Sequence, residues 1–410
     1  MLDVLSTTGM NEPIVITGVG IVSPIGIGTP EFYEAIYAGR SGLGNSAMVG
    51  NGTVAAEVRD FQPQRWLGTK GIRVLDRSAR LLSVAAHLAL KSSNTVIVTE
   101  VGDPDVGLVC GTMFGSLHSI TSFDLSGLTD GPNYVNPMEF PNTVINSAAG
   151  HTAIRFGLRG VTATICAGLA SGLHAIAYAE NSLRMGRARM LLAGGYDELC
   201  EESFVGFRKT GVSSPTNALR PFAPDRNGTV PGEACALCTL ETGSNARRRS
   251  VTATSSIAGF GASHDAYRID RFQLGADGAI LALRQALQNA QIKPEDVACI
   301  IASASGSRIA DEMEARALRS VFGSHLERIP ACAPKAALGE CMGAAGALGV
   351  ALASFALTRQ VLPPTMGFVC TEFGLRLSQQ PQPLEGECAL ITAFSCDGNN
   401  ACMVLRRWQG

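Results

Sequence analysis

The stretch from Ala163 to His174 holds the residue types that nucleophilic catalysis uses. It reads ATICAGLASGLH, an apolar strand that leads through a glycine turn into the start of a helix. A cysteine thiolate at such a turn can attack a carbonyl carbon. Here Cys166 falls in the strand, and Leu169 stands three residues later at the expected helix start. Since leucine has no nucleophilic atom, the position best placed for chemistry carries none.

The elements that must position this stretch alternate between strands and helices. Asp76 is a good N-cap for a helix over residues 77–91, and Gly186 ends the helix predicted over 169–185. Further helices are predicted over 276–291 and 311–322, and strands over 13–22, 106–110, 189–193, 251–259 and 298–302. Such alternation is typical of α/β folds with parallel strands. We expect a short polar extension at residues 1–11 and two related halves, 12–250 and 251–410.

Bulk composition indicates a large buried core. Of the 410 residues, 46% are hydrophobic and only 17% are charged, which argues against disorder. The net charge of -2 gives no indication of a nucleic acid or an anionic membrane as a partner.

Cysteine usage and apolar runs favour a cytoplasmic protein. The 12 cysteines lie mostly in apolar runs, as expected of buried thiols in a reducing compartment. Cys235 and Cys238 form a C-x-x-C within a strand-like run, so we interpret them as core residues and predict no metal site and no cofactor. The N-terminus shows no signal peptide. The uncharged run 341–358 approaches the length of a membrane span, but its small residues and the flanking Glu340 favour a buried core helix.

Several motifs in a fixed order resemble the β-ketoacyl-acyl carrier protein synthase family, of the fatty-acid and type II polyketide kind. The resemblance covers nearly the whole chain. Besides the stretch around Leu169, it is carried by residues 14–24 (IVITGVGIVSP), 146–151 (NSAAGH), 157–160 (GLRG), 193–195 (AGG), 220–228 (RPFAPDRNG), 231–233 (PGE), 259–261 (GFG), 265–267 (DAY) and 343–346 (GAAG). It implies the thiolase fold, in which two related α/β halves stack in five layers, α-β-α-β-α.

The resemblance also implies a chemistry that needs three parts. A cysteine thiolate takes the acyl chain from the carrier protein, two histidines assist decarboxylation of a malonyl unit, and backbone N–H groups stabilise the oxyanion. Counting from both flanks places the nucleophile position at Leu169. The first histidine position falls at Ser303, in the loop 303–311 (SASGSRIAD), and the second at Glu340, five residues after Lys335. We therefore predict a catalytically degenerate homologue.

Other family positions are kept or altered around these three. Lys335, Asp311 and Glu314 keep the family type, although they can be scaffold residues, and the gating loop is altered to FSCDGNN over 394–400. A carboxylate at position 340 would repel a malonyl or enolate anion, so we favour a structural ion pair or hydrogen bond for Glu340.

A subunit of this kind occurs in type II polyketide systems as the chain length factor, and the elbow sequence resembles that subfamily. The resemblance implies a heterodimer with an active ketosynthase, whose growing chain on acyl carrier protein enters a tunnel shaped by both subunits. Phe114, Leu117 and Thr121, on one face of the helix expected after residues 111–115, are predicted to set how long a chain fits. Ordinary interface packing is the alternative for Leu117 and Thr121.

Two other functions stay open at this point. One is an acyltransferase with rewired chemistry that uses Cys166 or Cys341 as its nucleophile. The other is a scaffold homologue that holds acyl carrier protein without a ketosynthase partner. Labelling with a cysteine-directed ketosynthase inhibitor, measured by intact mass, distinguishes the rewired acyltransferase from the other two functions. Co-expression with a ketosynthase distinguishes the chain length factor, which should form a heterodimer, from the scaffold homologue.

Overall fold

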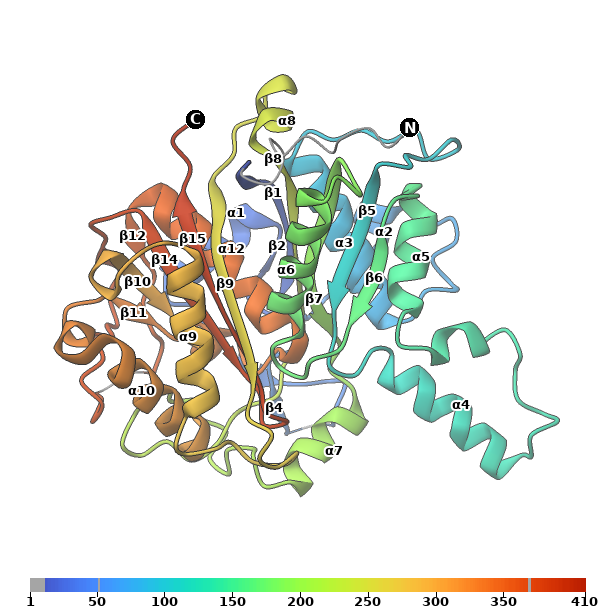
Figure 1. The fold of residues 1–410 in the computed structure, drawn as a ribbon. Helices are drawn as coiled ribbons and strands as arrows, with labels where there is room; N and C mark the ends of the chain where they lie inside the picture. Colours follow the sequence, from blue (N-terminus) through green and yellow to red (C-terminus); the bar gives the residue numbers. More distant parts are fainter. Residues whose placement is uncertain (1–11, 51, 368–369) are drawn as a thin grey trace.

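Two half-sheets with the same strand order organise the molecule, as the computed structural model shows for residues 12–50, 52–367 and 370–410 (Figure 1). The N-terminal half-sheet runs in the order β6 (Thr162–Ile165), β5 (Val106–Gly111), β7 (Met190–Asp197), β8 (Ala234–Thr242), β1 (Ile14–Ser23). The C-terminal half-sheet repeats that order with β11 (Ala331–Cys332), β10 (Val297–Ile301), β14 (Cys388–Phe394), β15 (Asn399–Arg407) and β9 (Ser255–His264). When the five strands of each half are numbered in chain order, both half-sheets run 3-2-4-5-1 from edge to centre.

The two half-sheets meet where β1 pairs with β9 through Val15, Ile16, Ser255 and Ser256. With the hairpin strand β2 (Gly26–Ile27) they form one sheet of 11 strands. Parallel pairs join β5 to β6 and β7, and β10 to β11 and β14, while the remaining neighbours are antiparallel. The expected α/β class is confirmed with a mixed rather than a purely parallel sheet.

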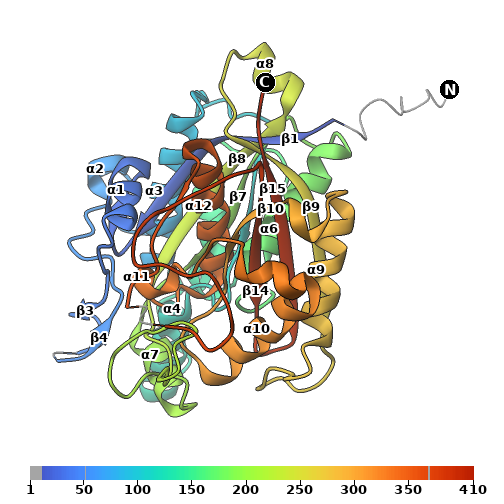
Figure 2. The ribbon, with the colours of Figure 1, turned by 90° about the vertical axis from the view of Figure 1, so that its left-hand side faces the viewer.

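Helices cover both half-sheets, so the molecule has five layers, α-β-α-β-α (Figure 2). Outer helices α3 (Arg77–Ser92) and α5 (Ser147–Phe156) pack on the N-terminal half, and α9 (Asp277–Asn289) and α10 (Arg308–Phe322) pack on the C-terminal half. The middle layer consists of α6 (Ser171–Arg184) and α12 (Ala345–Arg359), which contact each other and both half-sheets. This arrangement confirms the predicted thiolase fold.

The middle helices are apolar because both of their faces are covered. The segment Met342–Arg359 is long and apolar enough to cross a membrane by length and composition alone, but 78% of it is buried inside the protein. Glycine lets α6 and α12 approach closely: a Cβ on Gly346 of α12 would lie 2.8 Å from the Leu173 side chain of α6. The uncharged run is therefore a core helix of the middle layer, as predicted.

Some element boundaries differ from the sequence-based expectations. Helix α6 begins at Ser171, two residues after Leu169, because the chain must first turn at Gly168, whose φ is 54°. Helix α10 begins at Arg308 with Ser307 as its N-cap, and β9 begins at Ser255 rather than at 251. The predicted division into 12–250 and 251–410 stays a prediction, and the polar extension at residues 1–11 lies outside the described residues.

One segment projects from the layered body. It comprises α4 (Leu117–Thr129), the 3-10 helix η2 (Phe140–Thr143) and the loop between them, which we call the α4 arm (Figure 1). The remaining short elements surround the two half-sheets: α1 (Thr29–Tyr37), β3 (Gly44–Asn45), β4 (Val54–Ala55), α2 (Gln64–Leu67), α7 (Glu201–Lys209), α8 (Gly243–Arg248), η3 (Pro294–Asp296), η4 (Gly323–Glu327), α11 (Lys335–Leu338), η5 (Met342–Ala344), β12 (Val361–Leu362) and β13 (Gln382–Pro383).

Candidate functional site

The turn between β6 and α6 holds Leu169 in a fixed position. The backbone N–H of Leu169 donates a hydrogen bond to the hydroxyl of Ser395 at 3.0 Å. Ser395 belongs to the turn between β14 and β15, in the altered loop 394–400. A Cβ on Gly168 would collide with the side chains of Ser395 and Asp397, so only glycine fits there. The elbow and the loop are thus fastened together across the two halves of the molecule.

Leu169 faces a cavity that is almost completely filled. Its lining includes Ser303, Lys335 and Phe394, and the free volume is about 10 Å³. A volume of that size holds at most one water molecule, by the usual requirement of roughly 10–15 Å³. The lining residues within the described chain include no cysteine and no histidine. An acyl chain therefore has no room at this position, and no thiolate or imidazole is present to react with one.

Glu340 forms a buried ion pair. The Nζ atom of Lys335 lies 2.7 Å from Oε2 of Glu340, and both side chains are almost fully buried. The other carboxylate oxygen, Oε1, accepts a hydrogen bond from the N–H of Met342 at 3.2 Å. Because both charges are paired, the geometry is that of a structural ion pair, the interpretation favoured from the sequence. Lys335 lines the cavity under Leu169, so positions 169, 303 and 340 lie in one connected region.

Ser303 is held by hydrogen bonds on both sides. Its N–H donates to Oε1 of Glu314 at 2.9 Å and to the hydroxyl of Thr392 at 3.0 Å. Its Oγ accepts from the N–H of Phe394 at 3.3 Å. Burial raises the pKa of Glu314 to about 7, although the hydrogen bonds from Thr392 and Ser303 oppose the shift. The Ser303 hydroxyl therefore ties the 303–311 loop to the gating loop.

Asp311 has the same kind of structural task. Its carboxylate accepts hydrogen bonds from the N–H groups of Phe222 (2.8 Å), Ser305 (2.9 Å) and Gly306 (3.1 Å). Burial raises its pKa to about 6, against the effect of these donors. Asp311 thus fixes the loop that contains Ser303 to the mid-chain segment 220–228.

Asp197, at the end of β7, is a central residue that the sequence did not single out. Its carboxylate accepts from the Thr112 hydroxyl (2.6 Å) and from the N–H groups of Met113 (2.8 Å), Phe114 (3.0 Å) and Gly343 (2.7 Å). Burial raises its pKa to about 6. It fastens the entry to the α4 arm to the start of the 3-10 turn before α12. The only signal was a charged residue ending an apolar strand.

The predicted tunnel residues lie at the base of the α4 arm. Helix α4 begins at Leu117, so Phe114 precedes it and is separated from it by Gly115, which has a φ of 64°. The prediction that Phe114, Leu117 and Thr121 share one helix face is wrong for Phe114, because the chain turns before the helix begins. All three side chains are half-buried.

Neither alternative cysteine is an activated nucleophile in this structure. Cys166 is exposed, and its thiol donates to the carbonyl oxygen of Met113 at 3.5 Å. Burial of part of the thiol raises its pKa, whereas a reactive cysteine needs a lowered one. Cys341 is fully buried, and burial raises its pKa strongly. His174, on α6, packs edge-on against Phe260 with ring centroids 5.5 Å apart, and burial lowers its pKa.

Comparison with known families decides the relationship. Residues 11–246 match the N-terminal domain of beta-ketoacyl synthases, and residues 254–369 match their C-terminal domain. This protein belongs to the beta-ketoacyl synthase family. A 3-oxoacyl-[acyl-carrier-protein] synthase 2 from Coxiella burnetii is 31% identical over 96% of this chain and 98% of its own length. Nodulation protein E from Rhizobium leguminosarum bv. trifolii is 30% identical over 97% of this chain and the whole of its own.

Solved structures of the family include ketosynthase and chain length factor assemblies. The ishigamide ketosynthase/chain length factor structure superposes with a TM-score of 0.89 at 27% identity, over 97% of this chain and 100% of that chain. A ketosynthase in complex with its chain length factor from Xenorhabdus doucetiae shares the fold, with a TM-score of 0.81 at 23% identity over 97% of this chain and 98% of that chain. The resemblance to beta-ketoacyl synthases, predicted from the sequence motifs, is confirmed, and the relatives include 3-oxoacyl-[acyl-carrier-protein] synthase 2 enzymes.

Proposed function

We propose that this protein is a non-catalytic chain length factor that pairs with an active ketosynthase. The observation that carries the proposal is the filled cavity at the elbow, where Leu169 leaves about 10 Å³ free and a buried ion pair occupies the second histidine position. The family positions are assigned by counting along the sequence. Likeness to a ketosynthase/chain length factor structure at 27% identity supports the role.

The rest of the fold is kept as a binding subunit would need it. Gly168, the Ser395 contact and the Asp197 network preserve the elbow and its surroundings without a nucleophile. These contacts hold the elbow in shape although the described lining of its cavity has no cysteine and no histidine. We infer that the shape of this region is what the subunit contributes.

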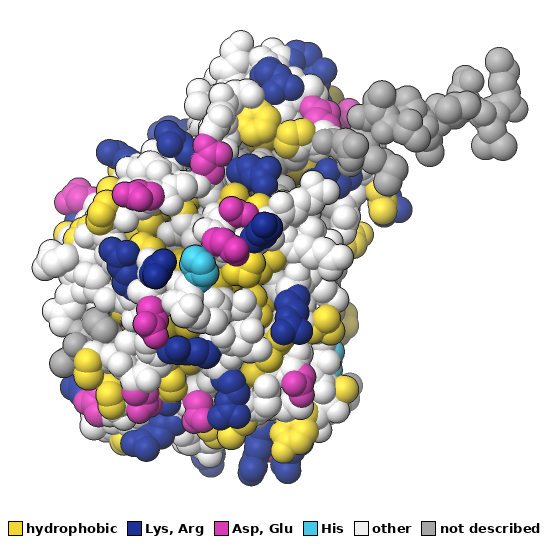
Figure 3. All heavy atoms as spheres, turned by 60° about the vertical axis from the view of Figure 1, so that its left-hand side comes forward, with side chains coloured by type: hydrophobic (Ala, Val, Ile, Leu, Met, Phe, Trp, Pro, Cys, Tyr) yellow, Lys and Arg dark blue, Asp and Glu magenta, His cyan; other side chains and the backbone are white. Residues whose placement is uncertain are grey.

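The surface that we assign to the ketosynthase consists of the edge strand β6 and the α4 arm. β6 has a neighbour on one side only within the described sheet. The arm exposes large apolar side chains, among them Leu125, Leu128, Tyr134, Met138 and Phe140. Contiguous apolar side chains on a projecting element are typical of obligate interfaces. The face drawn in Figure 3, in contrast, mixes positive, negative and apolar side chains.

In the pair, the growing chain is carried by acyl carrier protein and extended at the partner's cysteine. The base of the arm, with Phe114, Leu117 and Thr121, forms one wall of the tunnel that receives the chain. The backbone N–H of Phe114 donates a hydrogen bond to Oδ1 of Asp197 at 3.0 Å. The body of the molecule therefore fixes the backbone from which this ring projects. We place the pair in the cytoplasm, where fatty-acid and polyketide precursors are made.

Two experiments test the proposal. Co-expression with an active ketosynthase from the same organism should give a heterodimer that does not separate during purification. In that pair a cysteine-directed ketosynthase inhibitor should add mass to the partner only. Labelling of Cys166 in this subunit would support the rewired acyltransferase instead, and a stable monomer that binds acyl carrier protein alone would support the scaffold.

The tunnel assignment has its own test. Phe114→Ala enlarges the space at the base of the arm, so the reconstituted pair should release longer products, measured by mass spectrometry. Phe373→Ala removes a ring of the same size from a half-buried position against α10, outside the arm, and should leave product length unchanged. If Phe114→Ala also leaves the length unchanged, the assignment is wrong.

A further inference from the structure

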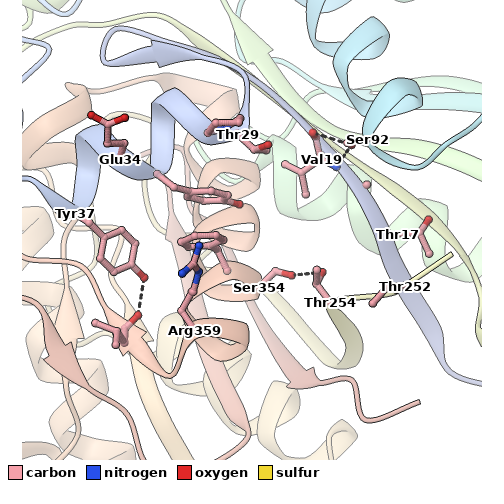
Figure 4. A pocket seen from close by; sticks show the side chains of 15 residues that line it. Thr17, Val19, Thr29, Glu34, Tyr37, Ser92, Thr252, Thr254, Ser354 and Arg359 are labelled. Carbon is pink, nitrogen blue, oxygen red and sulfur yellow. Dashed lines mark hydrogen bonds between the residues drawn. The ribbon is translucent and has the colours of Figure 1, made fainter.

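A large pocket lies far from the elbow, at the opposite end of the central helix α12. Its volume is about 900 Å³, within the range of roughly 300–1,000 Å³ that is typical of small-molecule sites. It is lined by β1, α1, the end of α3, the strand start near Thr254 and the C-terminal end of α12 (Figure 4). Helix α12 rises about 1.5 Å per residue, so its 15 residues place this pocket roughly 20 Å from the Leu169 cavity.

Aromatic rings with satisfied hydroxyl groups form one wall of the pocket. Tyr33 stacks on Phe355 with ring centroids 3.5 Å apart, and its hydroxyl donates to the carbonyl oxygen of Ala351 at 3.0 Å. The Tyr37 hydroxyl donates to the carbonyl oxygen of Val361 at 2.6 Å. Because these hydroxyl groups are already paired, the rings present apolar surface to whatever occupies the pocket.

The guanidinium group of Arg359 lies beside these rings in the pocket lining. Arg359 lies over the Phe355 ring, 5.2 Å from the centroid, and within the described residues no carboxylate pairs with it. The acidic residue at the pocket, Glu34, is paired outside it with Arg40 at 2.9 Å. The hydroxyl groups of Thr29 and Thr252 also line the pocket, and neither has a hydrogen-bond partner in the described part of the chain. The guanidinium group of Arg359 is therefore the cationic hydrogen-bond donor at the pocket, while the two threonine hydroxyls can donate or accept.

The pocket stays accessible when the partner face is covered. β1 is four strands away from the edge strand β6 in the half-sheet order, which corresponds to roughly 19 Å at about 4.8 Å per strand. The α4 arm projects beyond β5 and β6, away from α1 and α12 (Figure 1). A ligand in this pocket would thus reach the complex as well as the free subunit.

We propose that this pocket binds an amphipathic carboxylic acid, a molecule with a planar apolar body and one anionic end. The body lies against the Tyr33, Tyr37 and Phe355 rings, and the carboxylate accepts hydrogen bonds from the guanidinium group of Arg359 (Figure 4). Guanidinium groups bind carboxylates with strong, geometrically matched hydrogen bonds. The inference does not depend on the chain length factor proposal, since the pocket shares no residue with the elbow cavity.

Fluorescence titration of the full-length protein with cis-parinaric acid, a conjugated polyene carboxylic acid, tests the proposal. We expect saturable binding that Arg359→Gln weakens at least about fivefold, as loss of a hydrogen bond to a charged group implies. The methyl ester of the same acid should bind wild type and Arg359→Gln equally weakly. Thr252→Trp, which fills the pocket from an exposed position, should abolish the titration.

A matched variant isolates the effect of the charge. Arg284→Gln removes an exposed arginine from the solvent face of α9, remote from the pocket, and should bind cis-parinaric acid as wild type does. Circular dichroism and thermal unfolding of each variant establish that it folds. Equal binding of acid and ester to wild type, unchanged affinity in Arg359→Gln, persistence of binding in Thr252→Trp, or no binding to wild type would each overturn the proposal.

Discussion

The elbow cavity and the α4 arm handle apolar surface in opposite ways. At the elbow, Leu169 fills the space where a substrate would lie, and the charges of Lys335 and Glu340 neutralise each other. On the arm, Leu128 and Tyr134 expose 84% and 80% of their surface to solvent. A monomeric enzyme would show the reverse, with an open site and a covered surface. The contrast indicates that the elbow serves internal cohesion and that the arm serves contact with another molecule.

The largest expected effect comes from removing one member of the Lys335–Glu340 ion pair, which tests whether the elbow region stabilises the fold. Lys335→Met leaves the Glu340 carboxylate buried without a partner, so we expect the free energy of unfolding to fall by about 3–5 kcal/mol. Urea denaturation at constant pH measures it. The double variant Lys335→Met with Glu340→Gln removes both charges and should recover most of the loss. A loss below about 1 kcal/mol for the single variant would contradict a structural role for the pair.

The arm side of the comparison is tested by a charge at its exposed end. Leu128→Glu should weaken association with the ketosynthase by roughly 2 kcal/mol or more, about thirtyfold in Kd, because the carboxylate would be desolvated in the interface. Stability of the isolated subunit should stay within about 0.5 kcal/mol of wild type, since this position is exposed. Analytical ultracentrifugation of the pair provides the affinity.

Ser122→Glu is the matched control for that variant. It places the same charge on α4 at another exposed position whose native side chain is polar. We expect a change in Kd below about threefold for Ser122→Glu. Equal Kd values for Leu128→Glu and wild type would show that the exposed apolar face of the arm is not the partner surface.

The pH dependence of the unfolding free energy gives a further test of the elbow as a buried structural region, with a smaller expected effect. The pKa of Glu314 is raised to about 7, so the folded protein holds a proton there that the unfolded chain releases near its ordinary value. Stability contributed by this proton is fully present below about pH 4 and is lost as pH rises through about 7. We expect Glu314→Gln to reduce the fall in unfolding free energy between pH 5 and pH 8 by on the order of 2 kcal/mol.

Glu312→Gln provides the control for the pH experiment, because Glu312 is an exposed neighbour paired with Arg316 at 3.0 Å. Its urea-denaturation profile should follow wild type across the same pH range. Asp197 and Asp311, with pKa values raised to about 6, add slopes of the same sign in every variant. An unchanged slope in Glu314→Gln would contradict a raised pKa of Glu314 in the folded protein.

The sequence predicted much of the fold because its signals were local. Asp76 accepts the N–H of Ala79 at 2.8 Å, as an N-cap should, and the apolar run around Ala345 is the buried helix that its composition indicated. The helix start at Ser171 was missed because the turn before it is held by the hydrogen bond from Leu169 to Ser395, 226 residues away. Contacts of that separation leave no pattern in the neighbouring residues.

The residues of the elbow region could be predicted, but not their connections. Counting along the motifs gave Leu169, Ser303 and Glu340, which the structure brings into one region, and their assignment to the family's catalytic positions stays a prediction. The residues also favoured an ion pair for Glu340. The Asp197 network was not found, since a carboxylate at a strand end is common and its four donors come from two segments far apart in the sequence, 112–114 and Gly343. The free arginine at the second pocket was also missed, because Arg359 looks like an ordinary last-turn residue of a helix.

The smallest expected effect comes from restoring the missing nucleophile, and it bears most directly on what the elbow is for. Leu169→Cys should cost roughly 1–2 kcal/mol of stability as a reduction in buried apolar volume. We expect no condensation from a pair whose partner ketosynthase lacks its own cysteine, measured by mass spectrometry of acyl carrier protein. The new thiol would face Ser303 and the Lys335–Glu340 pair, with no imidazole in the cavity lining to assist a malonyl unit. Leu169→Ser is the matched control, and any turnover by Leu169→Cys above that of Leu169→Ser would show that the elbow retains the capacity for catalysis.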